Sequence, residues 1–236
     1  MSLTLLLPLF LGTGFALQPP GSFHGDEPVA TDGESWLGLR IDGDDAALVA
    51  TVVRVRPIED VVADDAPGQP SGREITSAQG DAIAMYLRGP RLRAGPIERA
   101  QTLPDASETV TSLPDYPLDF RGQRHRIAAH CDPEPVARVD GQAQFACRVV
   151  LDMQGRSQVL WATTGYFEPG ATMLGLGDDA SPNLLFAGDL DRDGKLDLLF
   201  DTTDHYNVRR PTLFLSTQAA PGELLGIAAQ FQSVGC

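Results

Sequence analysis

The chain has 236 residues, a formal net charge of −14 and a sequence pI of about 4.5. Its length is sufficient for one large domain or two small ones, each with a buried core. The acidic excess argues against nucleic acid as a partner, because phosphate binding requires a basic surface.

The N-terminus has the composition of a secretory signal peptide. Residues 1–22 carry no charge, Leu3 to Leu11 is largely apolar, and Gly14 and Ala16 place small residues at −3 and −1 of a cleavage site. We therefore predict a signal peptide over residues 1–16 and a secreted or periplasmic protein; a buried N-terminal strand or helix is the alternative. The apolar run is too short for a membrane span, and none is predicted.

The next part of the chain predicts a first β subdomain. Residues 17–34 are rich in Pro, Gly and Asp and are expected to form a flexible leader. Runs of β-branched and aromatic residues between turn residues are typical of strands, and they occur at 35–41, 47–55 and 82–88. We assign an N-terminal β subdomain to residues 35–105.

A boundary is expected in residues 101–119, which combine three prolines with many polar residues. A C-terminal β subdomain then covers residues 115–236, with further strands expected at 124–130, 142–151 and 158–161 and a loop at 132–141. The fold class is therefore mostly β, with antiparallel sheets that are sandwich-like or partly like a propeller blade.

Cysteines and histidines give weaker signals. Export would favour a disulfide, but Cys131, Cys147 and Cys236 allow three pairings, and the sequence does not choose among them. His125 and His130 lie near Cys131, but strand alternation places them on opposite faces. We interpret them as ordinary histidines of a sheet surface.

The most specific chemical signal is the segment 188–198, with the sequence Gly-Asp-Leu-Asp-Arg-Asp-Gly-Lys-Leu-Asp-Leu. Its acidic residues fall at positions 1, 3, 5 and 9 of a loop, with glycine at position 6. Ca²⁺ takes six to eight oxygen ligands, and carboxylates this close together would repel one another without a cation. The predicted calcium ligands are the side chains of Asp189, Asp191, Asp193 and Asp197 and the main-chain carbonyl of Lys195. A solvated acidic turn that binds nothing is the alternative.

The flanks of this loop distinguish between two calcium motifs. An EF-hand requires an acidic residue at position 12 and a helix on each side, whereas position 12 here is Phe200 and the flanks are short apolar runs. The segment instead resembles the calcium-binding β-hairpin of the FG-GAP/VCBS repeat family, on Asp189, Asp191, Asp193, Gly194, Leu196, Asp197 and Leu198. The resemblance covers only residues 182–231. It implies the same five metal ligands. The strands that we read at 183–187, 196–200, 212–216 and 225–231 would make one antiparallel sheet, as in a propeller blade.

We therefore expect an exported calcium-binding β protein with a binding or structural role, in which calcium stabilises the C-terminal sheet. Its partner would be a protein or a polysaccharide at the cell envelope, and residues 202–210 form the loop most suited to a ligand. An envelope hydrolase is an alternative, although neither a Gly-x-Ser-x-Gly nor a His-Glu-x-x-His motif occurs, and we assign no catalytic residue. A subunit of a cell-surface assembly is the third possibility.

Overall fold

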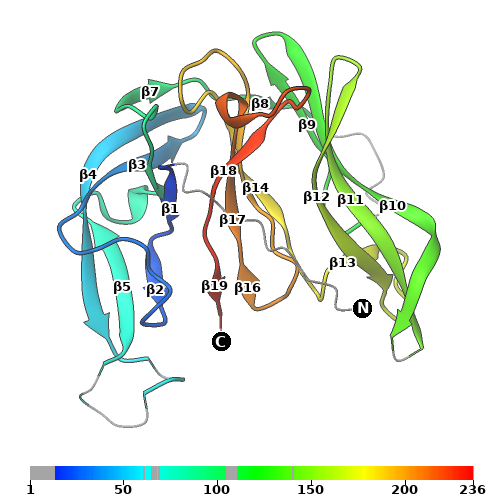
Figure 1. Ribbon diagram of the computed structural model, residues 1–236, viewed down its shortest axis with the longest axis horizontal. Helices are drawn as coiled ribbons and strands as arrows, with labels where there is room; N and C mark the ends of the chain where they lie inside the picture. Colours follow the sequence, from blue (N-terminus) through cyan, green and yellow to red (C-terminus); the bar gives the residue numbers. More distant parts are fainter. Residues whose placement is uncertain are drawn as a thin grey trace, which may run out of the picture.

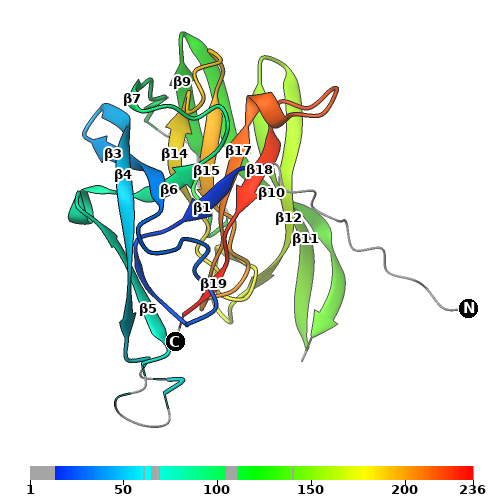
Figure 2. The ribbon, with the colours of Figure 1, turned by 60° about the vertical axis from the view of Figure 1, so that its left-hand side comes forward.

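The computed structural model describes residues 14–60, 62–64, 68, 70–104, 111–139 and 141–235. In this part of the chain the regular elements are strands and two short 3-10 helices, η1 (Gly80–Ala82) and η2 (Ser216–Gln218), with no α-helix. The main sheets are antiparallel and lie side by side as three layers (Figures 1 and 2). The prediction of a mostly β fold with antiparallel sheets is confirmed.

The first layer contains the N-terminal strands. In spatial order they are β1 (Ala16–Gln18), β6 (Met85–Arg88), β3 (Ser35–Asp42), β4 (Asp45–Ile58), β5 (Gly72–Ser77) and β2 (Gly21–Phe23), with β7 (Gly95–Ile97) pairing with β4.

The segment 17–34 differs from the expected flexible leader, because it contributes to β1 and β2. Leu17 and Gln18 are buried, and Oε1 of Gln18 accepts hydrogen bonds from the backbone N–H groups of Val29 and Ala30. The segment is therefore folded back on itself and packed on the sheet. Ala16, the expected cleavage residue, is the first residue of β1, and residues 1–13 of the predicted signal peptide lie outside the described residues.

The second layer has the spatial order β13 (Leu174–Leu176), β12 (Arg156–Phe167), β11 (Gln142–Met153), β10 (Gln123–Val139), β9 (Tyr116–Phe120) and β8 (Gln101–Thr102). Strand β10 continues through most of the predicted loop 132–141, with register shifts on either side of Pro135. Cys131 and Cys147 face each other across β10 and β11 and form a disulfide, with an S–S distance of 1.98 Å. Cys236 lies outside the described residues.

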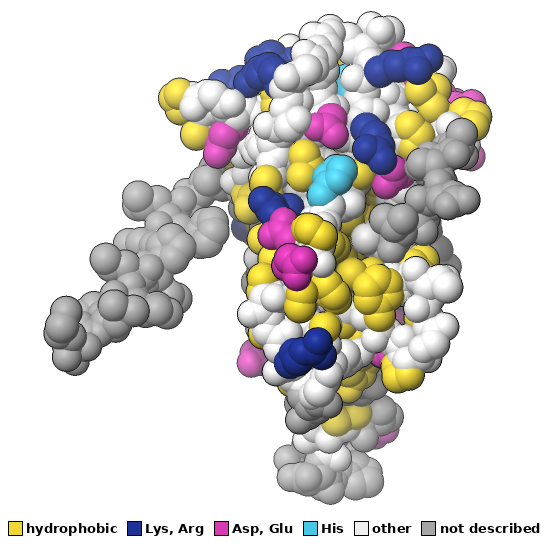
Figure 3. Space-filling view, turned by 90° about the vertical axis from the view of Figure 1, so that its right-hand side faces the viewer, with side chains coloured by type: hydrophobic (Ala, Val, Ile, Leu, Met, Phe, Trp, Pro, Cys, Tyr) yellow, Lys and Arg dark blue, Asp and Glu magenta, His cyan; other side chains and the backbone are white. Residues whose placement is uncertain are grey.

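The outer face of the second layer is open to solvent. Hydrophobic side chains gather on it among scattered charged ones (Figure 3), and the exposed apolar residues of this face include Val139 of β10 and Val159 of β12. The inner face of the same sheet carries buried residues such as Cys147, Val149 and Leu151. The sheet therefore has one face in the core and one in water, as antiparallel sheets commonly do.

The third layer is the predicted C-terminal sheet, and it lies between the other two (Figure 1). Its order is β14 (Asn183–Gly188), β15 (Asp197–Asp201), β17 (Pro211–Leu215) and β18 (Gly226–Gln230), which matches the four predicted strands. A separate short pair, β16 (Val208–Arg209) with β19 (Ser233–Val234), follows its lower end.

Both faces of this central sheet are buried. Leu198, Phe200 and Phe214 belong to the core shared with the second layer, whereas Leu199, Leu213 and Leu215 belong to the core shared with the first. Successive side chains of a strand point to opposite faces, so continuous apolar runs are what a sheet covered on both sides requires.

The β14–β15 connection, residues 189–196, lies where the three layers meet. The backbone N–H of Asp189 donates to the carbonyl of Glu98, which follows β7 of the first layer, at 2.9 Å. From the second layer, Arg121 donates from Nη1 to the carbonyl of Gly194 at 2.8 Å.

Among the described residues, no helix is both long and apolar enough to cross a membrane.

Candidate metal centre

Three carboxylates converge in the β14–β15 connection. Ligand oxygens of Asp189, Asp191 and Asp197 all lie within 4.8 Å of one another. The strand pairing explains this, because Gly188 pairs with Asp197 at the end of the ladder. Asp189 is the next residue after β14 and Asp197 is the first residue of β15, so the hairpin brings two acids that are eight positions apart in the sequence to the same point.

Hydrogen bonds within the loop hold these carboxylates in place. Oδ2 of Asp197 accepts from the backbone N–H of Leu190 at 2.9 Å and of Asp191 at 3.4 Å. Oδ2 of Asp189 accepts from the N–H of Gly194 at 2.9 Å. Gly194 has φ +88°, a conformation that L side chains rarely adopt. The glycine at position 6 therefore allows the backbone to turn its N–H toward the acids.

Two carboxylate oxygens of the group are left without a partner. Oδ1 of Asp189 and Oδ1 of Asp191 are buried and accept no hydrogen bond from the described residues. Asp189 is 4% exposed and Asp197 is 0% exposed. Buried polar atoms almost always have a partner, and oxygen is the donor that hard cations prefer. The donor set therefore fits a bound metal ion.

The electrostatics of the loop also indicate a missing positive charge. Burial, with a smaller contribution from the charges of Asp191 and Asp193, raises the pKa of Asp197 to about 8 against the opposing effect of its hydrogen bonds. Burial likewise raises the pKa of Asp189. Nη2 of Arg121 lies 3.4 Å from Oδ2 of Asp189. Nζ of Lys195 lies 3.9 Å from Oδ2 of Asp193. These two largely exposed cations compensate only part of the charge of four carboxylates, so the ionised loop is unfavourable without a further cation.

The five residues predicted as ligands are placed differently from one another. Asp189, Asp191 and Asp197 form the group described above. The carboxylate of Asp193 instead accepts hydrogen bonds from the N–H of Lys195 at 2.9 Å and from Oγ of Ser216 at 2.6 Å. The side chain of Lys195 is 71% exposed, and a ligand role for its carbonyl stays a prediction.

Sequence reasoning missed the residues that support the loop from a distance. Ser216 and Thr217, in η2, reach it from the end of β17: the N–H of Ser216 donates to Oδ1 of Asp197 at 2.9 Å, and Oγ1 of Thr217 donates to Oδ2 of Asp191. Both residues are separated from the acidic motif by about twenty positions, and nothing in their own sequence marks them.

Arg121 is the third supporting residue, and it carries a local signal. Arg121 and Gly122 form the two-residue turn between β9 and β10, with φ +54° and +74°. Such a turn favours Asn-Gly or Asp-Gly, so arginine at its first position is unusual. Its guanidinium binds Glu98 and the carbonyl of Gly194, which connects the second layer to the metal loop.

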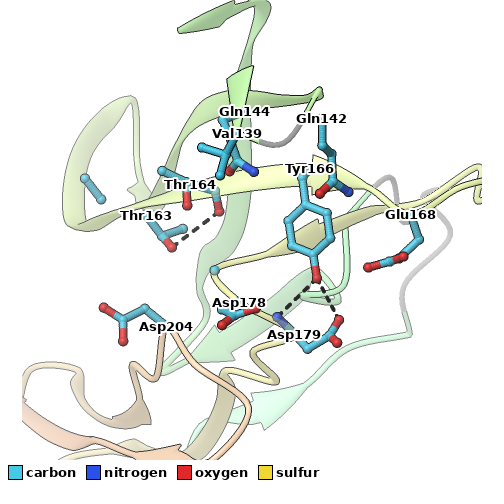
Figure 4. Close-up of a pocket in the computed structure, with 12 residues that line it drawn as sticks. Val139, Gln142, Gln144, Thr163, Thr164, Tyr166, Glu168, Asp178, Asp179 and Asp204 are labelled. Carbon is cyan, nitrogen blue, oxygen red and sulfur yellow. Dashed lines mark hydrogen bonds between the residues drawn. The ribbon is translucent and has the colours of Figure 1, made fainter. Parts of the chain in front are cut away.

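Other acidic residues lie apart from this group. Asp178, Asp179 and Asp204 line a surface groove of about 790 Å³ on the second layer (Figure 4). The hydroxyl of Tyr166 donates to Oδ1 of Asp179 at 2.7 Å, and Asp178 lies 3.0 Å from Nε2 of His205. Asp204 accepts a hydrogen bond from Nη2 of Arg210 at 2.8 Å. All three carboxylates therefore already have partners.

The two histidines near the disulfide have no common site. His125 is 4% exposed, whereas His130 is exposed on the opposite face of β10. The prediction of opposite faces is confirmed, although His125 belongs to the interior and not to a sheet surface.

Comparisons with protein-family models, curated proteins and solved structures found no match to this chain. The resemblance to the FG-GAP/VCBS hairpin therefore depends on the motif residues alone.

Proposed function

We propose that this is an exported protein in which Ca²⁺, held in the β14–β15 connection, stabilises the central sheet, and that its role is binding or structural. The observation that carries the proposal is the pair of buried carboxylate oxygens, Oδ1 of Asp189 and Oδ1 of Asp191, that have no partner among the described residues. A buried charge without compensation is strongly destabilising, and a divalent cation would supply the compensation.

The donor set favours calcium over other metals. Zn²⁺ is bound mainly by sulfur and nitrogen, and the group contains only carboxylate oxygens. Mg²⁺ usually keeps several waters, which a site with Asp189 and Asp197 almost fully buried does not readily accommodate. By the resemblance to the FG-GAP/VCBS hairpin, Asp193 and the main-chain carbonyl of Lys195 would complete the coordination shell of the calcium ion.

Stabilisation of the loop would extend to both cores. Asp197 is the first residue of β15, and its Oδ1 accepts a hydrogen bond from the backbone N–H of Ser216, the residue after β17. These two strands carry the side chains that fill the cores on either side of the central sheet. A cation that orders the loop therefore acts on the layer against which both outer sheets pack.

The location and partner follow from weaker observations. The Cys131–Cys147 disulfide suits an oxidising compartment outside the cytoplasm. A protein or polysaccharide at the cell envelope is the class of partner that this location suggests.

Calcium titration calorimetry on the full chain tests the proposal, together with melting curves in calcium and in chelator. We expect saturable Ca²⁺ binding, a higher melting temperature in calcium, and much weaker binding of Mg²⁺. Asp191→Asn removes one formal charge and replaces one carboxylate oxygen by an NH2 group that does not ligate, and it should weaken calcium binding strongly. Asp44→Asn, at an exposed aspartate in the β3–β4 turn, is the matched control and should bind as the wild type does. Identical melting temperatures in calcium and chelator, without heat of binding, would contradict the proposal.

A further inference from the structure

A second cavity lies directly beside the metal loop, between the second and third layers. Its volume is about 290 Å³. Its walls are largely apolar and come from both sheets and from the chain after η2: Phe120, Leu151, Met153, Leu196, Leu224 and Leu225. This size and lining fit part or all of a small organic molecule.

The charged side chains that line the cavity are basic, in contrast to the acidic chain as a whole. The protein has a formal net charge of −14, yet the residues that line this cavity include Arg121 and Lys195 and neither Asp nor Glu. Both cations also contact acidic side chains that do not line the cavity, Arg121 with Glu98 and Asp189 and Lys195 with Asp193. The charged groups that a ligand inside the cavity meets directly are therefore the two cations, which favour an anionic group.

The cavity also contains an oriented hydrogen-bonding group, His125. Its Nδ1 lies 2.9 Å from the carbonyl oxygen of Gln123. A carbonyl only accepts, so Nδ1 carries the proton and Nε2 is the acceptor. Burial lowers the pKa of His125, which agrees with this neutral form. Nε2 is therefore available to a ligand that carries a hydroxyl or N–H group.

We propose that this cavity binds a small organic acid, with its apolar body between Leu151, Met153 and Leu225 and its anionic group at the mouth, near Arg121 and Lys195. Apolar burial supplies most of the affinity, and the two cations select for negative charge. This part of the proposal does not depend on calcium.

Calcium and the acid should strengthen each other's binding, and this part rests on the proposed function. Gly194, Lys195 and Leu196 belong to the metal loop and also line the cavity. The guanidinium of Arg121 forms ion pairs with both Glu98 and Asp189. Ca²⁺ on Asp189 would leave Arg121 less neutralised and more attractive to an anion. Coupling between two binding sites is reciprocal, so the acid should tighten calcium binding by the same factor.

Two probes with the same apolar body test the charge selection. Binding of 4-(trifluoromethyl)benzoate and of 4-(trifluoromethyl)benzylamine to the full chain is followed by fluorine NMR. We expect the benzoate to bind at least about tenfold more tightly than the amine. Equal binding of the two probes, or no binding of the benzoate at millimolar concentration, would overturn the proposal.

Three variants locate the site. Met153→Trp fills the cavity and should abolish benzoate binding, whereas Met173→Trp, at a methionine that is 47% exposed and outside the cavity, should leave it unchanged. Lys195→Gln changes a side chain that is 71% exposed and should fold normally. It should reduce the preference for benzoate several-fold, and an unchanged preference would contradict the assigned position of the anionic group.

The same titrations in calcium and in chelator separate the two proposals. A several-fold tighter benzoate affinity in calcium supports the coupling. Equal affinities, in a protein that calorimetry shows to bind calcium, overturn the coupling and leave the cavity supported. Selective benzoate binding in a protein that does not bind calcium supports the cavity while the proposed function fails.

Discussion

The backbone N–H of Ser216 donates a 2.9 Å hydrogen bond to Oδ1 of Asp197, although 19 residues separate the two positions. Oδ2 of the same carboxylate accepts from Leu190 and Asp191. One buried side chain therefore connects the acidic loop to the far end of β17. The protonation state of Asp197 then matters for the whole central sheet.

The first prediction concerns pH in the absence of metal. The pKa of Asp197 is raised in the folded protein from an ordinary value of 3.8 to about 8. A raised carboxyl pKa contributes stability that is fully present below about pH 4 and is lost as pH rises toward 8. Metal-free protein should therefore lose this contribution across that range, as measured by melting temperature in metal-free buffers.

Asp197→Asn isolates the effect. The amide does not titrate, so the melting temperature of wild type minus that of the variant should fall steadily from pH 4.5 to pH 8 without metal. In calcium the same difference should rise with pH, because the ion binds the deprotonated carboxylate. A metal-free difference that is flat or rises with pH would show that Asp197 is ionised without a cation.

The second prediction concerns Ser216→Ala. The variant keeps the backbone hydrogen bond to Asp197 but removes the hydroxyl that donates to Oδ2 of Asp193 at 2.6 Å. Groups that orient metal ligands typically contribute about 10–100-fold to affinity. Calcium titration should show a loss near the lower end of that range, and Ser22→Ala, at an exposed serine of β2, should show none. An unchanged affinity in Ser216→Ala would exclude a supporting role for the hydroxyl.

The third prediction concerns the disulfide. Labelling without reductant should modify at most one of the three cysteines, because Cys131 and Cys147 are bonded to each other. Replacing both by alanine reopens a loop with a sequence separation of 16, which should lower the free energy of unfolding by about 3 kcal/mol. Denaturant unfolding of the double variant measures this loss. Two reactive thiols in the unreduced protein would contradict the pairing.

The fourth prediction tests the central position of the C-terminal sheet. Leu198 and Leu199 are neighbours on β15, are 0% and 1% exposed, and belong to different cores. Each Leu→Ala substitution should therefore cost about 2–5 kcal/mol of unfolding free energy. A sheet with one face in water would give one large and one small effect, so markedly unequal losses in denaturant unfolding would argue against the three-layer arrangement.

Much of the local structure could be predicted from the sequence because its signals are contiguous. The 1-3-5-9 spacing of the acids needs only one hairpin to bring Asp189, Asp191 and Asp197 together. The four strands of the central sheet follow one another along the chain and pair mostly with their neighbours. Short apolar runs between turn residues were therefore enough to find them.

The rest depends on contacts between distant parts of the chain. Gln18 lies in a segment whose Pro and Gly content suggests flexibility, yet hydrogen bonds to Val29 and Ala30 order it. Residues 132–141 were expected to form a loop, but most of them belong to β10, whose end among the described residues pairs with β11 alone and includes Pro133 and Pro135. Proline is tolerated at such an edge. The supporting contacts from Arg121 and Ser216 likewise cross between sheets, where local patterns carry no information.

The layer at the centre of the molecule is synthesised after the two outer sheets that it separates. The strands that separate and cover the two outer sheets begin at Asn183 and end at Gln230. A nascent chain that stops before them has two sheets, each with an inner face of buried residues and nothing to cover it. Neither core can close before these strands are made, so folding depends on contacts between residues far apart in the chain, which slow it. The proposed export suits this order, because both cores stay open until the strands from Asn183 onward have been added.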